Sequence, residues 1–342
     1  MDPQQSSALR QNHAEDCAAN HSDMSGDGPN SLPAKASESA EQRYKFELQE
    51  LVTYLRDRQC CLRDSNVERI EFFLPAEQFE QFDELVSCGE FAGRRVRYDY
   101  SYASQTLALR MPGIRHEIIV DLLKRCLNSF IDREKDKMES SMAKFAASLV
   151  PTGSADLYYS FKDAKSTIKR QPDLSITAEK NPKYPVLVGE VALSQTTKEL
   201  QNLAQEYIEH TRGHIRTVII VDLDYPRGKG AWLSVWKAKF GEDGKFEGVA
   251  CDDAVEIRNK DGVKNPNSQA RLFLSLEDFG LVRGTDNEDA DLQSVAAVSV
   301  FNIDDLCKEL ERADKMDESR KGSNAERPWN GSHHRYFFAD QM

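Results

Sequence analysis

The chain has 342 residues, and 39% of them are hydrophobic, which is enough for one large core or two smaller ones. It contains no uninterrupted apolar run of about 18 residues, so its composition excludes a membrane-spanning helix. The net charge of −12 argues against tight, non-specific binding to DNA.

The cysteines and the N-terminus indicate an intracellular protein. There are seven cysteines, an odd number without a Cys-x-x-Cys pair, which argues against a disulfide framework or a zinc knuckle. The first residues lack the basic and apolar regions of a secretory signal peptide. We therefore expect a nuclear or cytoplasmic location and no membrane partner.

The acidity is concentrated at the two ends of the chain. Residues 1–42 and residues 283–342 each carry a net charge of −5, whereas residues 43–282 carry only −2. Residues 1–42 have almost no large apolar side chains and are expected to be disordered. We divide the rest into an N-terminal α+β segment (43–94), an α/β domain (95–282), and a C-terminal part with an acidic loop, a helix and a disordered tail.

The N-terminal segment is expected to contain two helices and a strand. Apolar residues recur at helical spacing from Phe46 to Leu55, which predicts an amphipathic helix of about three turns. Residues 68–74 are typical of a strand, and residues 75–86 of a short helix.

The α/β domain begins with a predicted hairpin, because residues 95–102 and 106–111 alternate between polar and apolar side chains. The clearest helix of the chain follows, with an apolar face from Ile118 to Ile131. The other expected elements are strands at residues 155–161, 173–177, 186–192, 217–222 and 231–236, and a helix at residues 197–210. This order of elements favours a mixed sheet flanked by helices.

Beyond residue 240 the pattern weakens. Residues 255–257, 272–276 and 298–301 are expected to form strands, and a final helix is expected from Ile303 to about Lys315. An acidic loop at residues 285–293 separates the last two strands.

Two acids stand out in the α/β domain. Glu190 interrupts an apolar strand, where an ionised carboxylate is costly unless it is paired, bound to a metal or placed at a cleft. Asp173 lies seventeen residues earlier, and the turn between them allows a hairpin that brings both acids to one end of the sheet. Two converging carboxylates suit Mg²⁺ or Mn²⁺, which can activate water and neutralise charge on a phosphoryl group.

Pro172-Asp173 followed by Glu190-Val191-Ala192 resembles the PD-(D/E)XK motif of restriction-endonuclease-like nucleases. A longer series of segments looks like a group of fungal proteins that share this fold. Its members are residues 111–117, 153–156, 172–173, 184–195, 204–208 and 213–225. The resemblance covers about residues 95–240 and implies an α/β, restriction-endonuclease-like core, with a mixed sheet of about five strands, an N-terminal α+β segment and a C-terminal helical extension.

The resemblance also assigns roles to single residues. Asp173, Glu190 and Glu117 correspond to the metal ligands, with Glu117 acting through water. The lysine that orients the attacking water in the family is replaced here by Ala192. Gln195 and Lys198 are the candidates that could assist the attacking water in its place, and Lys169, which precedes the Asp173 strand, is a third and poorer candidate.

Each of these residues also has a structural interpretation. Asp173 after a proline is typical of a turn, and Glu190 could pair with a buried arginine or lysine. Glu117 begins a helix, where the dipole favours an acid, and Ser194-Gln195 could cap the next helix.

Two functions therefore remain open. The first is a metal-dependent phosphodiesterase that acts on nucleic acid, with altered or lost catalysis because Ala192 replaces the lysine. The second is a non-catalytic module that keeps the fold to bind protein or nucleic acid. A nuclease should bring three acids together around a metal, whereas a binding module should have Glu117 or Asp173 turned away or in salt bridges. The sequence predicts neither the oligomeric state nor a choice between DNA and RNA.

Overall fold

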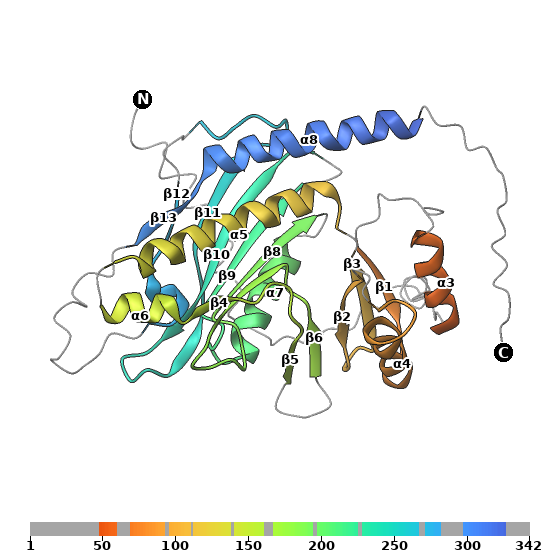
Figure 1. Ribbon diagram of the computed structural model, residues 1–342, viewed down its shortest axis with the longest axis horizontal. Helices are drawn as coiled ribbons and strands as arrows, with labels where there is room; N and C mark the ends of the chain where they lie inside the picture. Colours follow the sequence, from red (N-terminus) through yellow and green to blue (C-terminus); the bar gives the residue numbers. More distant parts are fainter. Residues whose placement is uncertain are drawn as a thin grey trace, which may run out of the picture.

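We analysed a computed structural model of the chain. It describes residues 48–59, 69–92, 96–110, 112–137, 140–160, 167–193, 197–224, 228–266, 271–281 and 297–325. The predicted disordered segment 1–42, the acidic loop and the C-terminal tail lie outside these ranges. Within them, two large β-sheets and two long helices dominate the molecule (Figure 1).

An antiparallel five-stranded sheet, in the order β1-β3-β2-β6-β5, forms one side of the molecule. Its strands are β1 (Arg69–Phe73), β2 (Arg97–Ser101), β3 (Thr106–Arg110), β5 (Leu157–Ser160) and β6 (Thr167–Arg170). Helices α3 (Leu48–Gln59) and α4 (Ala76–Ser87) pack on it through a core rich in aromatic side chains. The expected hairpin at 95–111 thus shares one sheet with β1 of the N-terminal segment and with a hairpin from the middle of the chain.

A mixed six-stranded sheet, in the order β11-β10-β9-β8-β7-β4, forms the other side (Figure 1). Its strands are β4 (Leu149–Pro151), β7 (Leu174–Ala178), β8 (Leu187–Leu193), β9 (Thr217–Leu223), β10 (Ala231–Phe240) and β11 (Phe246–Arg258). Strands β8 and β9 are parallel, because α7 (Thr197–His210) connects them as a crossover, and the other neighbours are antiparallel. The expected mixed α/β architecture is confirmed.

Helices cover both faces of the six-stranded sheet, because each buried strand presents alternate residues to opposite sides. On one face, α5 (Ile114–Lys135), α6 (Ser141–Ala147) and α8 (Ile303–Ala325) pack on a core that includes Leu187 and Val191 of β8. On the other face, α7 packs on Val188 and Ala192 of the same strand. Glu190 has the parity of Val188 and Ala192, so it belongs to the α7 face.

Several elements differ from the expectation. The expected strand at 155–161 does not pair with β7 but joins the five-stranded sheet as β5. The strand that pairs with β7 at the edge of the six-stranded sheet is β4, whose three residues are too few to show a period. The expected strand at 255–257 is the end of the 13-residue β11. A two-stranded antiparallel sheet of β12 (Arg271–Leu274) and β13 (Val298–Asn302) precedes α8, and the 3-10 helix η1 (Leu276–Phe279) follows β12. Helix α8 extends to Ala325 rather than to about Lys315. Among the described residues, no helix is long and apolar enough to cross a membrane.

Candidate functional site

The acid pair, Asp173 and Glu190, lies where the two sheets meet. Asp173 immediately precedes β7, and Glu190 is in the middle of β8. These strands are antiparallel with Leu174 opposite Gly189, which places the two acids side by side. Both approach one guanidinium: Nη1 of Arg110 is 3.1 Å from Oε2 of Glu190 and 3.7 Å from Oδ1 of Asp173. The spacing of the two acids in the sequence predicts this meeting.

Asp173 is almost completely buried, with 1% of its side chain exposed, and both of its oxygens have partners. Arg97 of β2 donates to Oδ1 at 2.7 Å. His116 of α5 lies 3.0 Å from Oδ2, which also accepts the backbone N–H of Val191 at 2.7 Å. Burial alone would raise the pKa of Asp173, but the positive charges of His116 and Arg110 and these hydrogen bonds hold it well below its usual value. Asp173 is therefore ionised and neutralised by side chains.

Glu190 is also buried and has a donor on each oxygen. Arg110 donates to Oε2 at 3.1 Å, and the hydroxyl of Tyr207 on α7 donates to Oε1 at 2.5 Å. Burial and the nearby negative charge of Asp173 raise the pKa of Glu190 to about 8, although Arg110 and Tyr207 act in the opposite direction. The two acids of the pair thus have different proton affinities, and Glu190 is the one that holds a proton more readily.

Glu117 and His116 occupy the first turn of α5. The Glu117 side chain is 40% exposed, and its carboxylate lies 3.6 Å from both Nη2 of Arg97 and Nδ1 of His116. Burial lowers the pKa of His116, but the charge of Asp173, the hydrogen bond to it and the nearby Glu117 carboxylate outweigh burial and raise the pKa to about 9. Glu117 therefore pairs with the cations that surround Asp173.

The residues predicted to assist the attacking water do not gather at the acid pair in the described part of the chain. Gln195 lies outside the described residues. Lys198 is exposed on the first turn of α7 and does not line the cavity beside the acids. Ala192 is buried against α7. Lys169, a weaker candidate as a displaced lysine, is 1% exposed and bound to Asp83, Asp156 and Tyr98, away from the acid pair.

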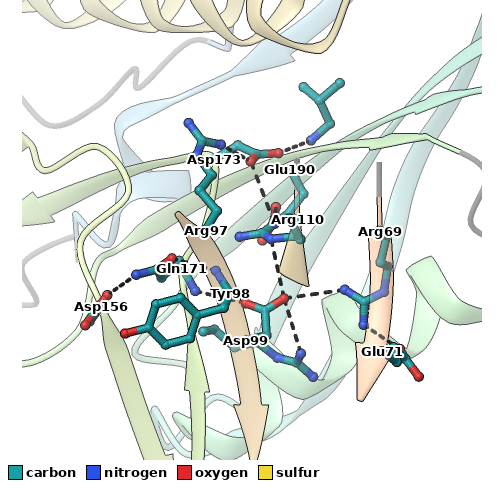
Figure 2. Close-up of polar contacts among 12 residues, drawn as sticks. Arg69, Glu71, Arg97, Tyr98, Asp99, Arg110, Asp156, Gln171, Asp173 and Glu190 are labelled. Atoms are coloured by element: carbon teal, nitrogen blue, oxygen red, sulfur yellow. Dashed lines mark hydrogen bonds and ion pairs between the residues drawn. The ribbon is translucent and has the colours of Figure 1, made fainter. Parts of the chain in front are cut away.

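A fourth acid, Asp99 of β2, extends the network of charges (Figure 2). Its Oδ2 lies 3.5 Å from Arg69, 3.5 Å from Arg110 and 3.6 Å from Arg170. Its Oδ1 accepts the backbone N–H of Gln171 at 3.1 Å. Burial would raise the pKa of Asp99, but the three arginines lower it. Arg110 thus connects Asp99 with the acid pair.

Neither Asp99 nor these arginines are among the site residues that the sequence predicts. Arg97 and Asp99 are two residues apart in a predicted strand, so their side chains must share one face. Arg110 ends the next strand of that hairpin and lies opposite Arg97. Three charged residues on one face of a predicted hairpin indicate that this face packs against residues of opposite charge, and this pattern could have identified them.

A cavity of about 250 Å³ opens beside these residues. Side chains of both sheets and of α7 form its wall. Its charged lining consists of four arginines (Arg69, Arg97, Arg110 and Arg170), His116 and six acids (Glu71, Asp99, Asp173, Glu190, Glu199 and Glu206).

The arrangement does not fit the Mg²⁺ or Mn²⁺ site that the resemblance implies. Mg²⁺ binds carboxylate oxygens and keeps several waters, whereas every oxygen of the acid pair already accepts a hydrogen bond from a side chain or the backbone. Within the described ranges, no three His, Cys, Asp or Glu side chains are grouped so that they could hold a metal ion. The site is therefore a network of buried ion pairs.

In comparisons with known proteins, the chain matches no protein-family model and no curated protein.

Proposed function

We propose that the chain is a non-catalytic binding module with a PD-(D/E)XK-like fold, in which the acid pair holds arginine side chains. One observation carries this proposal: Nη1 of Arg110 lies between Glu190 and Asp173, at 3.1 and 3.7 Å. A single guanidinium is thus shared by the two carboxylates that the resemblance assigns to a metal ion.

The energetics of the site favour this interpretation. A metal ion at the acid pair would have to displace buried cationic groups from their partners. The side chains of Arg97 and Arg110 are only 14% and 17% exposed, so each would become a poorly solvated charge without its acid. Removing one partner of such a pair typically costs about 3–5 kcal/mol. Metal binding would have to offset this cost.

The order of elements supports the fold that the proposal assumes. In the six-stranded sheet, α5 precedes β4, β7 and β8, and α7 then leads to β9 and β10. The sequence predicts the same order of helix, three strands, helix and two strands, but its first predicted strand, residues 155–161, belongs to the other sheet, and β4 takes that place. The hairpin of β5 and β6 is inserted between β4 and β7 and joins the other sheet.

The lack of a suitable amine at the acid pair, among the residues that the structure describes, also favours binding over catalysis. Ala192 occupies the position at which the family has its lysine, and Lys169 is held by Asp83 and Asp156. Lys198 would have to reach the acids from an exposed position on α7. Among the described residues, no lysine contacts the acid pair.

A cleavage assay tests the proposal. Plasmid and oligonucleotide substrates of DNA and RNA would be incubated with the full chain and Mg²⁺ or Mn²⁺, and Mn²⁺ binding would be measured by calorimetry. We expect no cleavage and no Mn²⁺ binding that depends on the acid pair. Cleavage that disappears in Asp173→Ala and Glu190→Ala, but persists in the control Asp121→Ala, would overturn the proposal. Asp121 is a suitable control because its side chain is 68% exposed on α5.

A second candidate function is a metal-dependent phosphodiesterase acting on nucleic acid. The observation in its favour is the closeness of the two acids, which approach the same nitrogen of Arg110. For this function Arg97 and Arg110 would have to leave the acids when the metal binds. The cleavage result that would overturn the first proposal would establish this one.

A further inference from the structure

Arg216, which immediately precedes β9, is a partly buried arginine without an acid. In the part of the chain that the structure describes, every other buried or partly buried arginine forms an ion pair with a carboxylate. These arginines are Arg69, Arg97, Arg110, Arg115, Arg170 and Arg258. Burial lowers the pKa of Arg216, and no acid of the described residues acts against this effect. The desolvation of this guanidinium is therefore not offset by a carboxylate of the described chain.

The guanidinium of Arg216 is held in place by packing and is still accessible. Its Cζ lies 3.9 Å from the centre of the Phe240 ring, at the end of β10. A Cβ atom added to Gly280 would lie 3.5 Å from both Cγ and Nε of Arg216, so this glycine packs closely against the side chain. None of the guanidinium nitrogens is buried. A planar fork of donors that is stacked on an aromatic ring and open to solvent is suited to binding a carboxylate with two parallel hydrogen bonds.

An acid beside Arg216 is already engaged by other residues. Asp278 of η1 is close, because its backbone carbonyl accepts the hydroxyl of Thr217 at 2.8 Å. However, Oδ1 of Asp278 lies 2.9 Å from Nζ of Lys237, and Oδ2 accepts the backbone N–H of Ser275 at 2.7 Å. The Asp278 carboxylate is therefore not available to Arg216.

Other cations without ion pairs lie in the same corner of the molecule, where the loop after α7 meets the turn between β7 and β8. Nδ1 of His214 in the loop is 3.3 Å from Nδ2 of Asn181 in the turn, and the rings of His214 and Tyr184 are 5.9 Å apart. We call the five basic residues of these two segments the basic corner: Lys180, Lys183, Arg212, His214 and Arg216. Its two lysines and Arg212 are exposed and form no ion pair with a described residue. Residues 179–184 and 209–216 together contain two acids against four lysines and arginines, so the corner has an excess of positive charge.

The basic corner is separate from the acid pair. It lies at the start of β8 and β9, where Leu187 is paired with Thr217. The cavity beside the acid pair is instead lined by residues 191–193, at the end of β8. A partner can therefore bind at the basic corner whatever the acid pair holds.

We propose that the basic corner binds an acidic peptide segment of a partner protein, with one carboxylate of the segment on the guanidinium of Arg216. The exposed cations of the corner meet neighbouring carboxylates of the same segment. A short acidic segment fits better than nucleic acid, because the protein carries a net charge of −12, which repels a long polyanion. The inference goes beyond the proposed function, since it depends neither on the acid pair nor on the absence of cleavage.

Fluorescence anisotropy with the full chain tests the inference, in the presence of a chelator. The probes are a labelled oligo-glutamate peptide, an oligo-lysine peptide of the same length, and single-stranded DNA and RNA oligonucleotides. We expect saturable binding of the oligo-glutamate peptide only. This binding should weaken as salt is added, because salt screens exposed charges.

Arg216→Lys is the informative variant, because lysine keeps the charge but lacks the planar fork of donors. We expect it to weaken oligo-glutamate binding by at least about fivefold, since charge-assisted hydrogen bonds are lost. The matched control is Arg56→Lys on α3, whose side chain is 49% exposed and packs with the other sheet; it should bind as the wild type does. If Arg216→Lys does not fold, Lys183→Gln at an exposed position of the corner is the second test, with an expected loss of about twofold.

Three results would overturn the inference. The first is the absence of saturable oligo-glutamate binding to the wild type, and the second is equal binding by the wild type and the folded variant of the corner. The third is binding of DNA or RNA that is tighter than oligo-glutamate binding and depends on Arg216, because it would assign the corner to nucleic acid. Metal-dependent cleavage would refute the proposed function but leave these titrations in chelator unaffected, so the two failures can be told apart.

Discussion

The guanidinium of Arg97 lies 2.7 Å from the carboxylate of Asp173, and this contact joins the five-stranded sheet to the six-stranded sheet. Arg110 makes the same connection to Glu190 at 3.1 Å. The acid pair thus holds two parts of the fold together, through arginines that lie 76 and 80 positions earlier in the chain.

Lys169 should contribute to stability rather than to catalysis. Its ammonium is 1% exposed and lies 2.5 Å from Asp83 and 2.8 Å from Asp156. Lys169→Ala removes this cation, but Asp83 and Asp156 are 31% and 38% exposed and regain solvation, so we expect a loss of about 2 kcal/mol of unfolding free energy in urea denaturation. The matched control Lys245→Ala removes an 82% exposed lysine and should change stability by less than about 1 kcal/mol. Equal effects of the two substitutions would contradict this role.

The sequence predicts the strands that carry the acids because their patterns are strong. An apolar run marks β8, and the turn at residues 181–185 limits how β7 and β8 can pair, so the meeting of Asp173 and Glu190 follows. A three-residue strand such as β4 is too short to show a period, so the sequence does not predict it.

The partners of the acids could not be predicted in the same way. Arg97 and Arg110 belong to a hairpin whose local pattern indicates only that they share one face. That this face meets the start of β7 depends on how the two sheets pack, and no local pattern contains this information. The resemblance therefore implied a metal ion at the acid pair, where the packing of the two sheets places the guanidiniums of Arg97 and Arg110.

The C-terminal helix α8 should be held in place by a buried acid. Asp314 lies 2.6 Å from Arg115 of α5 and 2.7 Å from Arg258 of β11, and the side chains of all three residues are at most 10% exposed. Asp314→Ala would leave two buried guanidiniums without their shared partner, and we expect a loss of about 3–5 kcal/mol. Urea denaturation gives the value.

Asp317→Ala is the matched control for this helix. Asp317 is 23% exposed and lies 3.8 Å from Arg115, so its removal should cost about 1 kcal/mol or less. If Asp314→Ala were no more destabilising than Asp317→Ala, the buried triad would not anchor α8.

The stability of the protein should fall as the pH rises from about 6.5 to about 9. Burial lowers the pKa of His116, but Asp173 outweighs it and raises the pKa in the folded state to about 9, above the ordinary 6.5. A raised histidine pKa contributes stability that is complete below about pH 6.5 and is lost through about pH 9. The raised pKa of Glu190, about 8, acts in the same direction, because its protonated form is the one favoured by folding.

Urea denaturation at several pH values measures this decline, which we expect to be about 3 kcal/mol from His116 alone. His116→Gln should be less stable than the wild type at pH 6 and should show a smaller decline up to pH 9. Parallel pH profiles of the two proteins would show that His116 does not hold its proton against Asp173.

The unfolding free energy of Asp173→Asn, measured by urea denaturation in the presence of a chelator, tests the central claim most directly. If Asp173 neutralises Arg97, Arg110 and His116, its loss of charge should destabilise the metal-free protein by about 3 kcal/mol or more. Asp132→Asn, whose side chain is 69% exposed, should be nearly neutral. If the two acids instead formed a metal site, they would repel each other without the metal, and Asp173→Asn would leave stability unchanged or increase it. That result would contradict the account.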